Sequence, residues 1–169
     1  HMISLILSNA VERRDSEAIL EKKIQDRTQA LMKSEARLKE AQRVGKMGSW
    51  EWKVQENNVN WSDELYNIYG VSSDNFEPTF EGFLSLVHPN DTAYVKNYLT
   101  TSLDKTSPMD FKHRIVRPAD KKVIHVHCLG EITTDRKGLP IRMRGTAQDI
   151  TDQKKYEVVI RTRFDLEVP

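Results

Sequence analysis

Four residues with metal-binding or reactive side chains lie in one stretch of the sequence: His113, His125, His127 and Cys128. His125 and His127 are two residues apart, so on a β-strand their imidazoles would point to the same face, a spacing that can chelate a metal ion. A zinc site needs at least three protein ligands, and no third ligand is evident nearby. We therefore interpret this pair as a solvated strand face and expect no metal site.

The other two residues belong to alternating apolar patterns that predict buried strand faces. Cys128 stands among apolar alternates, which favours a small buried side chain over a reactive thiol. His113 lies between Phe111 and Ile115 on the inward face of its strand, so it is either a hydrogen-bonded core histidine or part of a ligand pocket. The candidate pocket residues are Phe111, His113, Ile115 and Cys128.

None of the common enzyme motifs occurs in the sequence. There is no glycine-rich phosphate loop, no His-Glu-x-x-His pair and no Gly-x-Ser-x-Gly elbow. Most Asp and Glu residues fall in turns, helix starts or charged faces rather than in pairs that could share a cleft. We therefore expect a chain with no catalytic residues, no enzymatic activity and no cofactor.

Composition narrows the class of protein further. The 169 residues carry 26 basic and 25 acidic side chains, a balance that does not favour nucleic-acid binding. No apolar run approaches the ~18 residues of a membrane span. A single cysteine excludes an internal disulfide and suits a reducing compartment. We expect a cytoplasmic protein whose chain contacts neither nucleic acid nor membrane.

Residues 3–44 predict one long helix, because they contain no Gly or Pro and are rich in helix-forming residues. Four apolar residues follow a heptad seam along it: Leu20, Ile24, Leu31 and Leu38. Arg27 and Ser34 interrupt this seam, which is therefore narrow and imperfect. A helix of this length spans roughly 63 Å and cannot bury its apolar side against one small domain. We expect a parallel homodimer through this helix, with a solvated single helix as the alternative.

Residues 45–150 predict a domain of class α+β. Short alternating patterns indicate strands near residues 50–54, 59–61, 111–116, 124–132 and 141–150. Ser62 is expected to cap a first short helix, a second lies near residues 80–87, and a longer third begins at Pro89. Two strands, then helices, then three strands imply a five-stranded antiparallel sheet with short helices on one face.

The stretch GTAQDITDQKKYE, residues 145–157, predicts a strand that ends directly at a helix start. Gly145 would allow a close approach to a neighbouring strand, and Thr151 would cap the exit helix, which with its tail makes up residues 151–169. Asp149 would accept hydrogen bonds near that helix start or pair with Arg43 or Lys46 where the first helix arrives. Asp149 and Thr151 are therefore candidate signal-relay residues.

Four motifs follow one another along the middle of the chain: GSWEWKVQENNVNWSDELYNIYGV, VHPND, FKHRIVRPAD and GTAQDIT. In this order and spacing they resemble a PAS domain, over about residues 45–157. Within that family, the closing Asp-Ile-Thr ends the last strand and opens the output helix. The first helix is similar to helices that leave GAF domains in bacterial sensor kinases.

The resemblance implies the PAS fold and a regulatory role in a bacterial two-component system. We expect a sensor and dimerisation module that relays a signal from an upstream input domain to a downstream effector, a histidine kinase. Haem-binding relatives place a histidine on a pocket-lining helix, and flavin-adduct relatives carry a cysteine in a helix motif. The predicted helix that begins at Pro89 holds no histidine, and Cys128 lies on a predicted strand. A cofactor- or ligand-binding sensor and a purely structural dimerisation module are the alternatives.

Overall fold

A computed structural model describes the backbone of residues 2–165 and the side chains of residues 13–160. By its contacts the chain divides into two compact units, one up to Ala41 and one from Gln42 onward. The last residues of the predicted exit segment, 166–169, lie outside the described residues. Among the residues described, no helix has the length and apolar character that crossing a membrane requires.

Helix α1 (Met2–Val44) forms where the sequence lacks Gly and Pro, and it ends directly before Gly45. The side chains of its predicted seam are solvent-exposed in the single chain, by 57% to 61%: Leu20, Ile24, Leu31 and Leu38. A long predicted N-terminal helix is therefore confirmed. Its pairing into a coiled coil stays a prediction.

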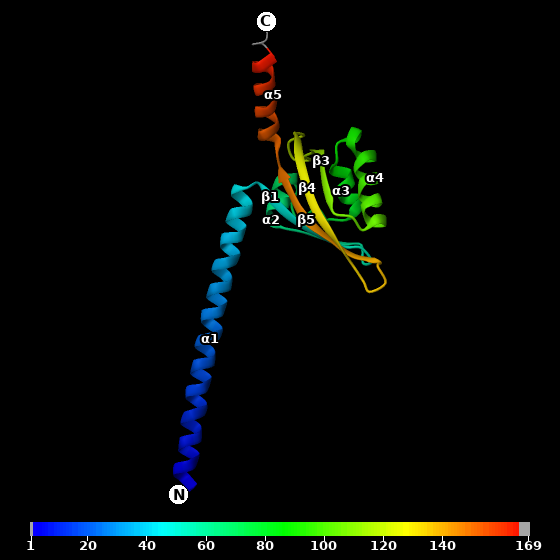
Figure 1. Ribbon diagram of the computed structural model, residues 1–169. Coiled ribbons are helices and arrows are strands. Elements are labelled where there is room, and N and C mark those ends of the chain that lie inside the picture. The colour runs from blue at the N-terminus through cyan, green and yellow to red at the C-terminus, as the bar shows by residue number, and fades with distance from the viewer. Residues whose placement is uncertain (1, 166–169) are drawn as a thin grey trace. The chain divides into compact units, whose positions relative to one another are not determined.

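The second unit is built on one antiparallel sheet in the order β2-β1-β5-β4-β3 (Figure 1). Its strands are β1 (Met47–Lys53), β2 (Asn58–Trp61), β3 (Met109–Val116), β4 (Val123–Thr134) and β5 (Pro140–Asp149). The last strand, β5, lies between β1 and β4 at the centre of the sheet. The chain therefore leaves the domain from the strand that pairs with its first strand.

Three helices follow the first two strands: α2 (Asp63–Tyr69), α3 (Phe80–Leu86) and α4 (Pro89–Lys105). Gly70 ends α2 in a left-handed conformation, and Thr79 caps α3 by accepting a hydrogen bond from the Gly82 amide. Ser62 precedes α2 as expected, but its hydroxyl makes no cap bond and instead accepts from the Ser49 amide at 3.0 Å. The prediction that Ser62 caps this helix through its side chain is wrong.

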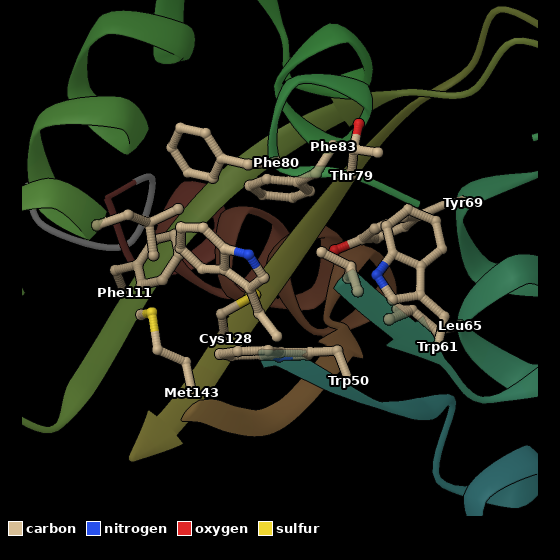
Figure 2. A pocket seen from close by; sticks show the side chains of 13 residues that line it. Trp50, Trp61, Leu65, Tyr69, Thr79, Phe80, Phe83, Phe111, Cys128 and Met143 are labelled. Carbon is tan, nitrogen blue, oxygen red and sulfur yellow. The ribbon is translucent and has the colours of Figure 1, made fainter. Parts of the chain in front are cut away.

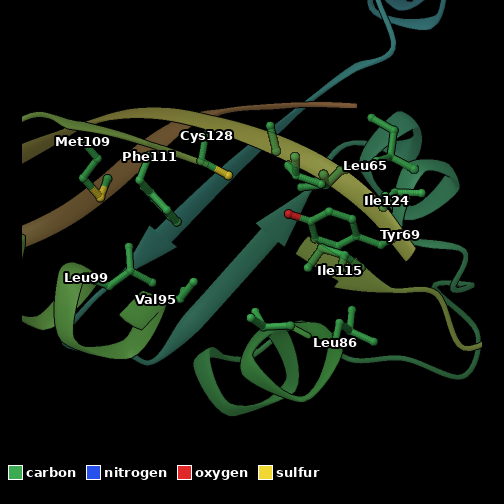
Figure 3. Packing of buried hydrophobic residues seen from close by; sticks show 14 of the residues in the cluster. Leu65, Tyr69, Leu86, Val95, Leu99, Met109, Phe111, Ile115, Ile124 and Cys128 are labelled. Atoms are coloured by element: carbon green, nitrogen blue, oxygen red, sulfur yellow. The ribbon is translucent and has the colours of Figure 1, made fainter. Parts of the chain in front are cut away.

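The core lies between the inner sheet face and these helices (Figure 3). It gathers residues from α2, α4 and the sheet, among them Leu65, Tyr69, Val95, Leu99 and Ile115, all buried. Asp91, in the first turn of α4, ties that helix to β3, since its carboxylate accepts from the Arg114 amide at 2.9 Å and from the Arg114 guanidinium. The predicted α+β class, with a five-stranded antiparallel sheet and helices on one face, is confirmed.

One row of residues crosses the inner face of all five strands: Trp61, Trp50, Gly145, Gly130 and Met109. The two glycines leave space that the Trp50 indole fills, because a Cβ on Gly145 would stand 2.8 Å, and one on Gly130 2.9 Å, from Trp50 Cζ2. The predicted close approach at Gly145 is confirmed, and it concerns both the neighbouring strand and this indole.

Candidate functional site

A cavity of about 60 Å³ lies between the inner sheet face and the helices. Figure 2 shows Trp50, Cys128 and Met143 on its sheet side and Phe80 and Phe83 on its helix side. Leu65 and Tyr69 of α2, Thr79 before α3 and Leu99 of α4 complete much of the wall. An apolar void of this size costs roughly 1.5 kcal/mol of stability, so its contents bear on the fold.

The polar atoms of the cavity wall are few and uncharged. The Thr79 hydroxyl already accepts from the Gly82 amide at 2.9 Å. Burial raises the pKa of the Cys128 thiol to about 12 and raises the pKa of the neighbouring Tyr69 phenol, so both groups are neutral. Trp52 Nε1 is buried and has no hydrogen-bond partner among the described residues, although Trp52 lines the cavity and stacks on Phe80.

Two of the four predicted pocket residues, Phe111 and Cys128, line this cavity. His113 and Ile115 do not; they are buried core residues farther along β3. Three tryptophans that are not among the predicted pocket residues, Trp50, Trp52 and Trp61, also contribute to the cavity wall. Their alternation with polar residues in β1 and β2 was the available signal, since it placed all three on the helix-covered face.

A haem or flavin does not fit this cavity. Its volume is about 60 Å³, whereas an engineered apolar cavity of about 150 Å³ accommodates a molecule of the size of benzene. No histidine stands among the lining residues, and Cys128 approaches from a strand as a neutral thiol. The wall also offers no charged group to a flavin phosphate.

His113 is 4% exposed and packs between two aromatic rings, those of Phe111 and Phe83. Both of its ring nitrogens are buried without a hydrogen-bond partner among the described residues, so the expectation of a hydrogen-bonded core histidine is wrong. Burial lowers the pKa of His113 from 6.5 to about 4, and the Asp91 carboxylate opposes this only in part. The imidazole is therefore neutral at physiological pH.

This buried imidazole predicts an acid-sensitive fold. Below about pH 6.5 the His113 imidazole takes up a proton in the unfolded chain but stays neutral in the folded chain. The free energy of unfolding therefore decreases as the pH falls from about 6.5 to about 4. The full effect is at most roughly 3 kcal/mol, and it levels off at lower pH. Urea unfolding between about pH 7 and pH 4 should show this slope in the native chain and a flatter one in His113→Phe.

His125→Gln, on the other sheet face, serves as the control and should keep the slope of the native chain. If His113→Phe keeps that slope too, the acid sensitivity arises from other groups. The His113 ring would then be able to take up its proton within the folded domain.

A second feature is the joint, which we define as residues 45–47 and 148–152, where the chain enters and leaves the sheet. The Asp149 amide donates to the Lys46 carbonyl at 2.9 Å, and the Gln148 side chain donates to the Gly45 carbonyl at 3.1 Å. Lys46 has a left-handed backbone, with φ of 47°, which is uncommon for a lysine. Two segments about a hundred residues apart in sequence are thus bonded directly to each other.

The side chains of the joint differ from the prediction in two ways. Thr151 is the first residue of helix α5 (Thr151–Asp165), and its hydroxyl accepts from the His125 amide at 2.9 Å, so its predicted role as the helix cap is wrong. Asp149 accepts from the Thr151 amide at 2.9 Å, which confirms a carboxylate acceptor at this helix start. Lys46, however, pairs with Asp152 at 2.7 Å rather than with Asp149.

The Lys46–Asp152 pair links the incoming segment to the first turn of α5. Its hydrogen bond raises the pKa of Lys46 and lowers the pKa of Asp152. Both side chains are more than half exposed, at 54% and 57%. The pair therefore contributes little to stability and weakens with added salt.

The histidine pair of β4 does not line the cavity, and only the backbone of His125 reaches the joint. His127 Nε2 lies 2.7 Å from Asp110 Oδ1 across the strand pair, and the His125 backbone bonds to the start of α5. No group of three potential metal ligands is present within the described part of the chain.

Similarity to known proteins indicates the family to which this domain belongs. A family model described as PAS fold matches residues 58–147. The chain is 24% identical over 115 residues to a probable diguanylate cyclase, DgcE, of Escherichia coli, covering 68% of this chain and 10% of that protein. It is 31% identical over 87 residues to hybrid signal transduction histidine kinase I of Dictyostelium discoideum, covering 51% of this chain and 5% of that protein.

Solved structures agree on the fold. A sensory box histidine kinase/response regulator from Burkholderia thailandensis matches with a TM-score of 0.62 at 24% identity, over 77% of this chain and 97% of that one. The N-terminal domain of a diguanylate cyclase with a PAS/PAC sensor, from Marinobacter aquaeolei, matches with a TM-score of 0.59 at 15% identity, over 64% and 98%. The family model covers more than half of the 169 residues, and the sheet order and helices agree with it. This chain therefore belongs to the PAS fold family and carries a sensor domain related to those of histidine kinases and diguanylate cyclases.

Proposed function

We propose that this chain is a regulatory module that relays a change in its first helix to an effector attached beyond α5. The joint is the observation that carries this proposal. Residues 45–47 and 148–152 are held to each other by a main-chain hydrogen bond, a hydrogen bond from the Gln148 side chain and one ion pair, so displacement of one segment must strain or move the other. A relay needs such a contact between the segment that enters the domain and the segment that leaves it.

The proposed active unit is a homodimer paired through α1. Support comes from the seam, whose four apolar side chains are exposed in the single chain. Helix α5 also exposes apolar residues, at Tyr156, Val159 and Ile160. In the single chain these apolar side chains of both helices face solvent, and a second copy of the chain would cover them.

The proposed effector is a histidine kinase. The match to the Dictyostelium kinase and the fold shared with the Burkholderia protein support it. A diguanylate cyclase is the second candidate, supported by the Escherichia coli relative. The chain spans about a tenth or less of the length of these two curated relatives, so the effector itself belongs to the proposal.

The relay is tested by neutralising the ion pair of the joint. Lys46→Gln and Asp152→Asn each remove one charge of an exposed pair, so the free energy of unfolding should change by less than about 1 kcal/mol. In the protein that joins this chain to its effector, both variants should change the ratio of stimulated to basal effector activity, several-fold and in the same direction. Autophosphorylation or cyclic dinucleotide synthesis would provide the readout.

Lys154→Gln is a matched control, because it breaks a pair with Glu157 of the same 2.7 Å length that lies wholly within α5. It should leave the activity ratio unchanged. If the activity ratio of all three variants equals that of the native protein, coupling does not pass through the Lys46–Asp152 pair. A ratio altered equally by Lys154→Gln would trace the effect to charge on α5 rather than to the joint.

A further inference from the structure

We propose that helix α3 is a pH-gated lid, which lifts from the sheet when His113 takes up a proton while the rest of the domain stays folded. The open lid would expose the His113 ring and one side of the cavity to water. This opening is a property of the domain itself and goes beyond the relay. Only an effect of the lid on an effector would rest on the proposed function.

Two buried groups that lack hydrogen-bond partners lie against this one helix. Among the described side chains, buried nitrogens without a partner occur in Trp52, His113 and Arg117. The Trp52 indole stacks on Phe80, the first residue of α3, with ring centroids 5.1 Å apart. The His113 ring packs at right angles to Phe83 of the same helix, with centroids 5.6 Å apart. Lifting α3 would give both nitrogen groups water as a partner, so the closed position carries a desolvation cost at each of them.

A proton on His113 would find little compensation while α3 is closed. Phe111 stacks on the ring at 5.2 Å and Val126 lies opposite on β4, and neither side chain can accept a hydrogen bond from it. From α4 the Asp91 carboxylate favours the protonated ring. This carboxylate already accepts from the amide and the guanidinium of Arg114. The closed imidazolium would therefore be a buried cation with two N–H donors and no acceptor.

The other titratable groups near the ring do not supply the missing charge. Glu81, the acidic residue of α3, is solvent-exposed. Tyr69 on α2 and Cys128 on β4 are neutral, because burial raises the pKa of both groups. His88, the N-cap of α4, becomes positive on protonation and so cannot stabilise a second cation. Relief for a protonated His113 must therefore come from water.

Helix α3 is the neighbour of His113 that can move away most easily. Strand β3 pairs with β4 along its whole length, from Met109 to Val116. Helix α4 is fixed by buried side chains that include Val95 and Leu99. Helix α3 has seven residues and a single buried one, Leu86. Elements with few buried apolar contacts open locally at a lower free energy than the whole domain.

The chain on either side of α3 allows it to turn. Val87, directly after the helix, pairs with Ile115 of β3 and anchors the C-terminal end. Residues 71–79, before the helix, form neither helix nor strand. A rotation about the C-terminal end would carry the Phe83 ring away from His113. Phe83 also lines the cavity (Figure 2), so part of its ring has no packing contact to lose.

The size of the effect follows from proton linkage. Burial lowers the pKa of His113 from 6.5 to about 4, and the ring would regain its ordinary pKa when α3 is open. The closed position is therefore favoured fully above about pH 6.5 and loses stability as the pH falls toward about 4. The ratio of open to closed molecules should rise about 20-fold between pH 7 and pH 5.

Hydrogen exchange of backbone amides tests the lid, with each rate expressed as protection relative to an unstructured chain at the same pH. The protection of the Phe83 to Val87 amides should fall about 20-fold from pH 7 to pH 5. Urea at concentrations below the unfolding transition should leave this protection unchanged, because a local opening exposes little surface. The Val126 amide of the central sheet should remain better protected and should lose protection steadily with urea.

Variants of the two histidines assign the titrating group. His113→Phe keeps an aromatic ring that cannot titrate, so the protection of α3 should no longer depend on pH. His113→Leu answers the same question if a phenylalanine does not fit between Phe111 and Phe83. His88→Gln is the matched control, because it removes the histidine whose charge acts on Asp91, and it should keep the full 20-fold loss.

Three results would each overturn the lid. The protection of α3 could be the same at both pH values, could keep its pH dependence without His113, or could fall with urea as steeply as that of Val126. The third result would mean that α3 opens only when the whole domain unfolds. The relay is tested separately by Lys46→Gln at about pH 7, where His113 is neutral, so either proposal can fail without the other.

Discussion

Gly145→Val should remove at least about 3 kcal/mol from the free energy of unfolding and lower the melting temperature by roughly 10 °C or more. The reason is steric. A Cβ at this position would stand 1.9 Å from the Leu129 carbonyl oxygen and 2.7 Å from the Gly130 Cα. Both atoms belong to the backbone of β4, so no side-chain rotation relieves the clash. Strands β4 and β5 would have to separate in the middle of the sheet.

Denaturant unfolding followed by tryptophan fluorescence measures this effect. Thr146→Val, at the next position and on the other face of β5, keeps the size and branching of the side chain and should change stability by no more than about 0.5 kcal/mol. The Trp50 indole is the alternative obstacle, since it lies 2.8 Å from the same Cβ position. If adding Trp50→Leu restores the stability of Gly145→Val, the indole rather than the neighbouring backbone makes glycine necessary here.

The sheet was predictable because alternation is a local property. Phe111, His113 and Ile115 share a face whatever surrounds them, since successive strand residues point to opposite sides. The partners of a buried group are not local. Nothing in the spacing of His113 reveals that Phe111 and Phe83 would enclose its ring and leave both nitrogens without a partner.

The same limit explains the two helix-start predictions that failed. Ser62 and Thr151 both stand where a strand hands over to a helix, and both were expected to bond their own helix. Each hydroxyl instead accepts a hydrogen bond from a backbone amide of the adjacent strand. The donor to Ser62 is Ser49, and the donor to Thr151 is His125. In both places the hydroxyl continues the strand ladder by one further bond. Capping preferences describe an isolated helix, and here a neighbouring strand competed for the same oxygen.

The cavity could not be foreseen, because it is a mismatch in packing rather than a motif. The sequence shows that Trp50, Trp52 and Trp61 face inward, but not that their rings fail to fill the space beneath α3. The joint was foreseen in part. Lys46 was one of the basic residues expected to pair with Asp149. Its ammonium group instead pairs with Asp152, in the first turn of α5.

Leu31→Asp should raise the dissociation constant of the proposed homodimer at least a hundredfold, on the order of 3 kcal/mol or more. Leu31 is 60% exposed in the single chain and occupies the middle of the seam between Ile24 and Leu38. In a parallel coiled coil the two Leu31 side chains would face each other, so the substitution removes two buried leucines and sets two carboxylates together. Sedimentation equilibrium should show the shift toward monomer.

Met32→Asp is the matched control, because Met32 is the neighbouring residue, is 64% exposed and lies off the seam. It introduces the same charge one position away and should leave the dimer intact. If both variants stay dimeric, the interface lies outside the seam. If Met32→Asp alone dissociates, the helices pair through a different face from the one that the heptad spacing predicts.

The direction of pairing needs a test of its own, since a relay to paired effectors requires both exit helices to leave the same end of the dimer. Ile24→Cys places one thiol on the seam, and the natural Cys128 is buried and does not compete. In a parallel dimer in register the two new thiols meet, and mild oxidation should crosslink most of the protein. In an antiparallel dimer they are separated by most of the seam unless position 24 happens to lie at the crossing point. A second variant, Leu38→Cys, settles that case, because an antiparallel pair cannot bring both positions to their own counterparts. Crosslinking of both variants therefore supports the parallel dimer on which the proposed relay depends, and crosslinking of one or neither rejects it.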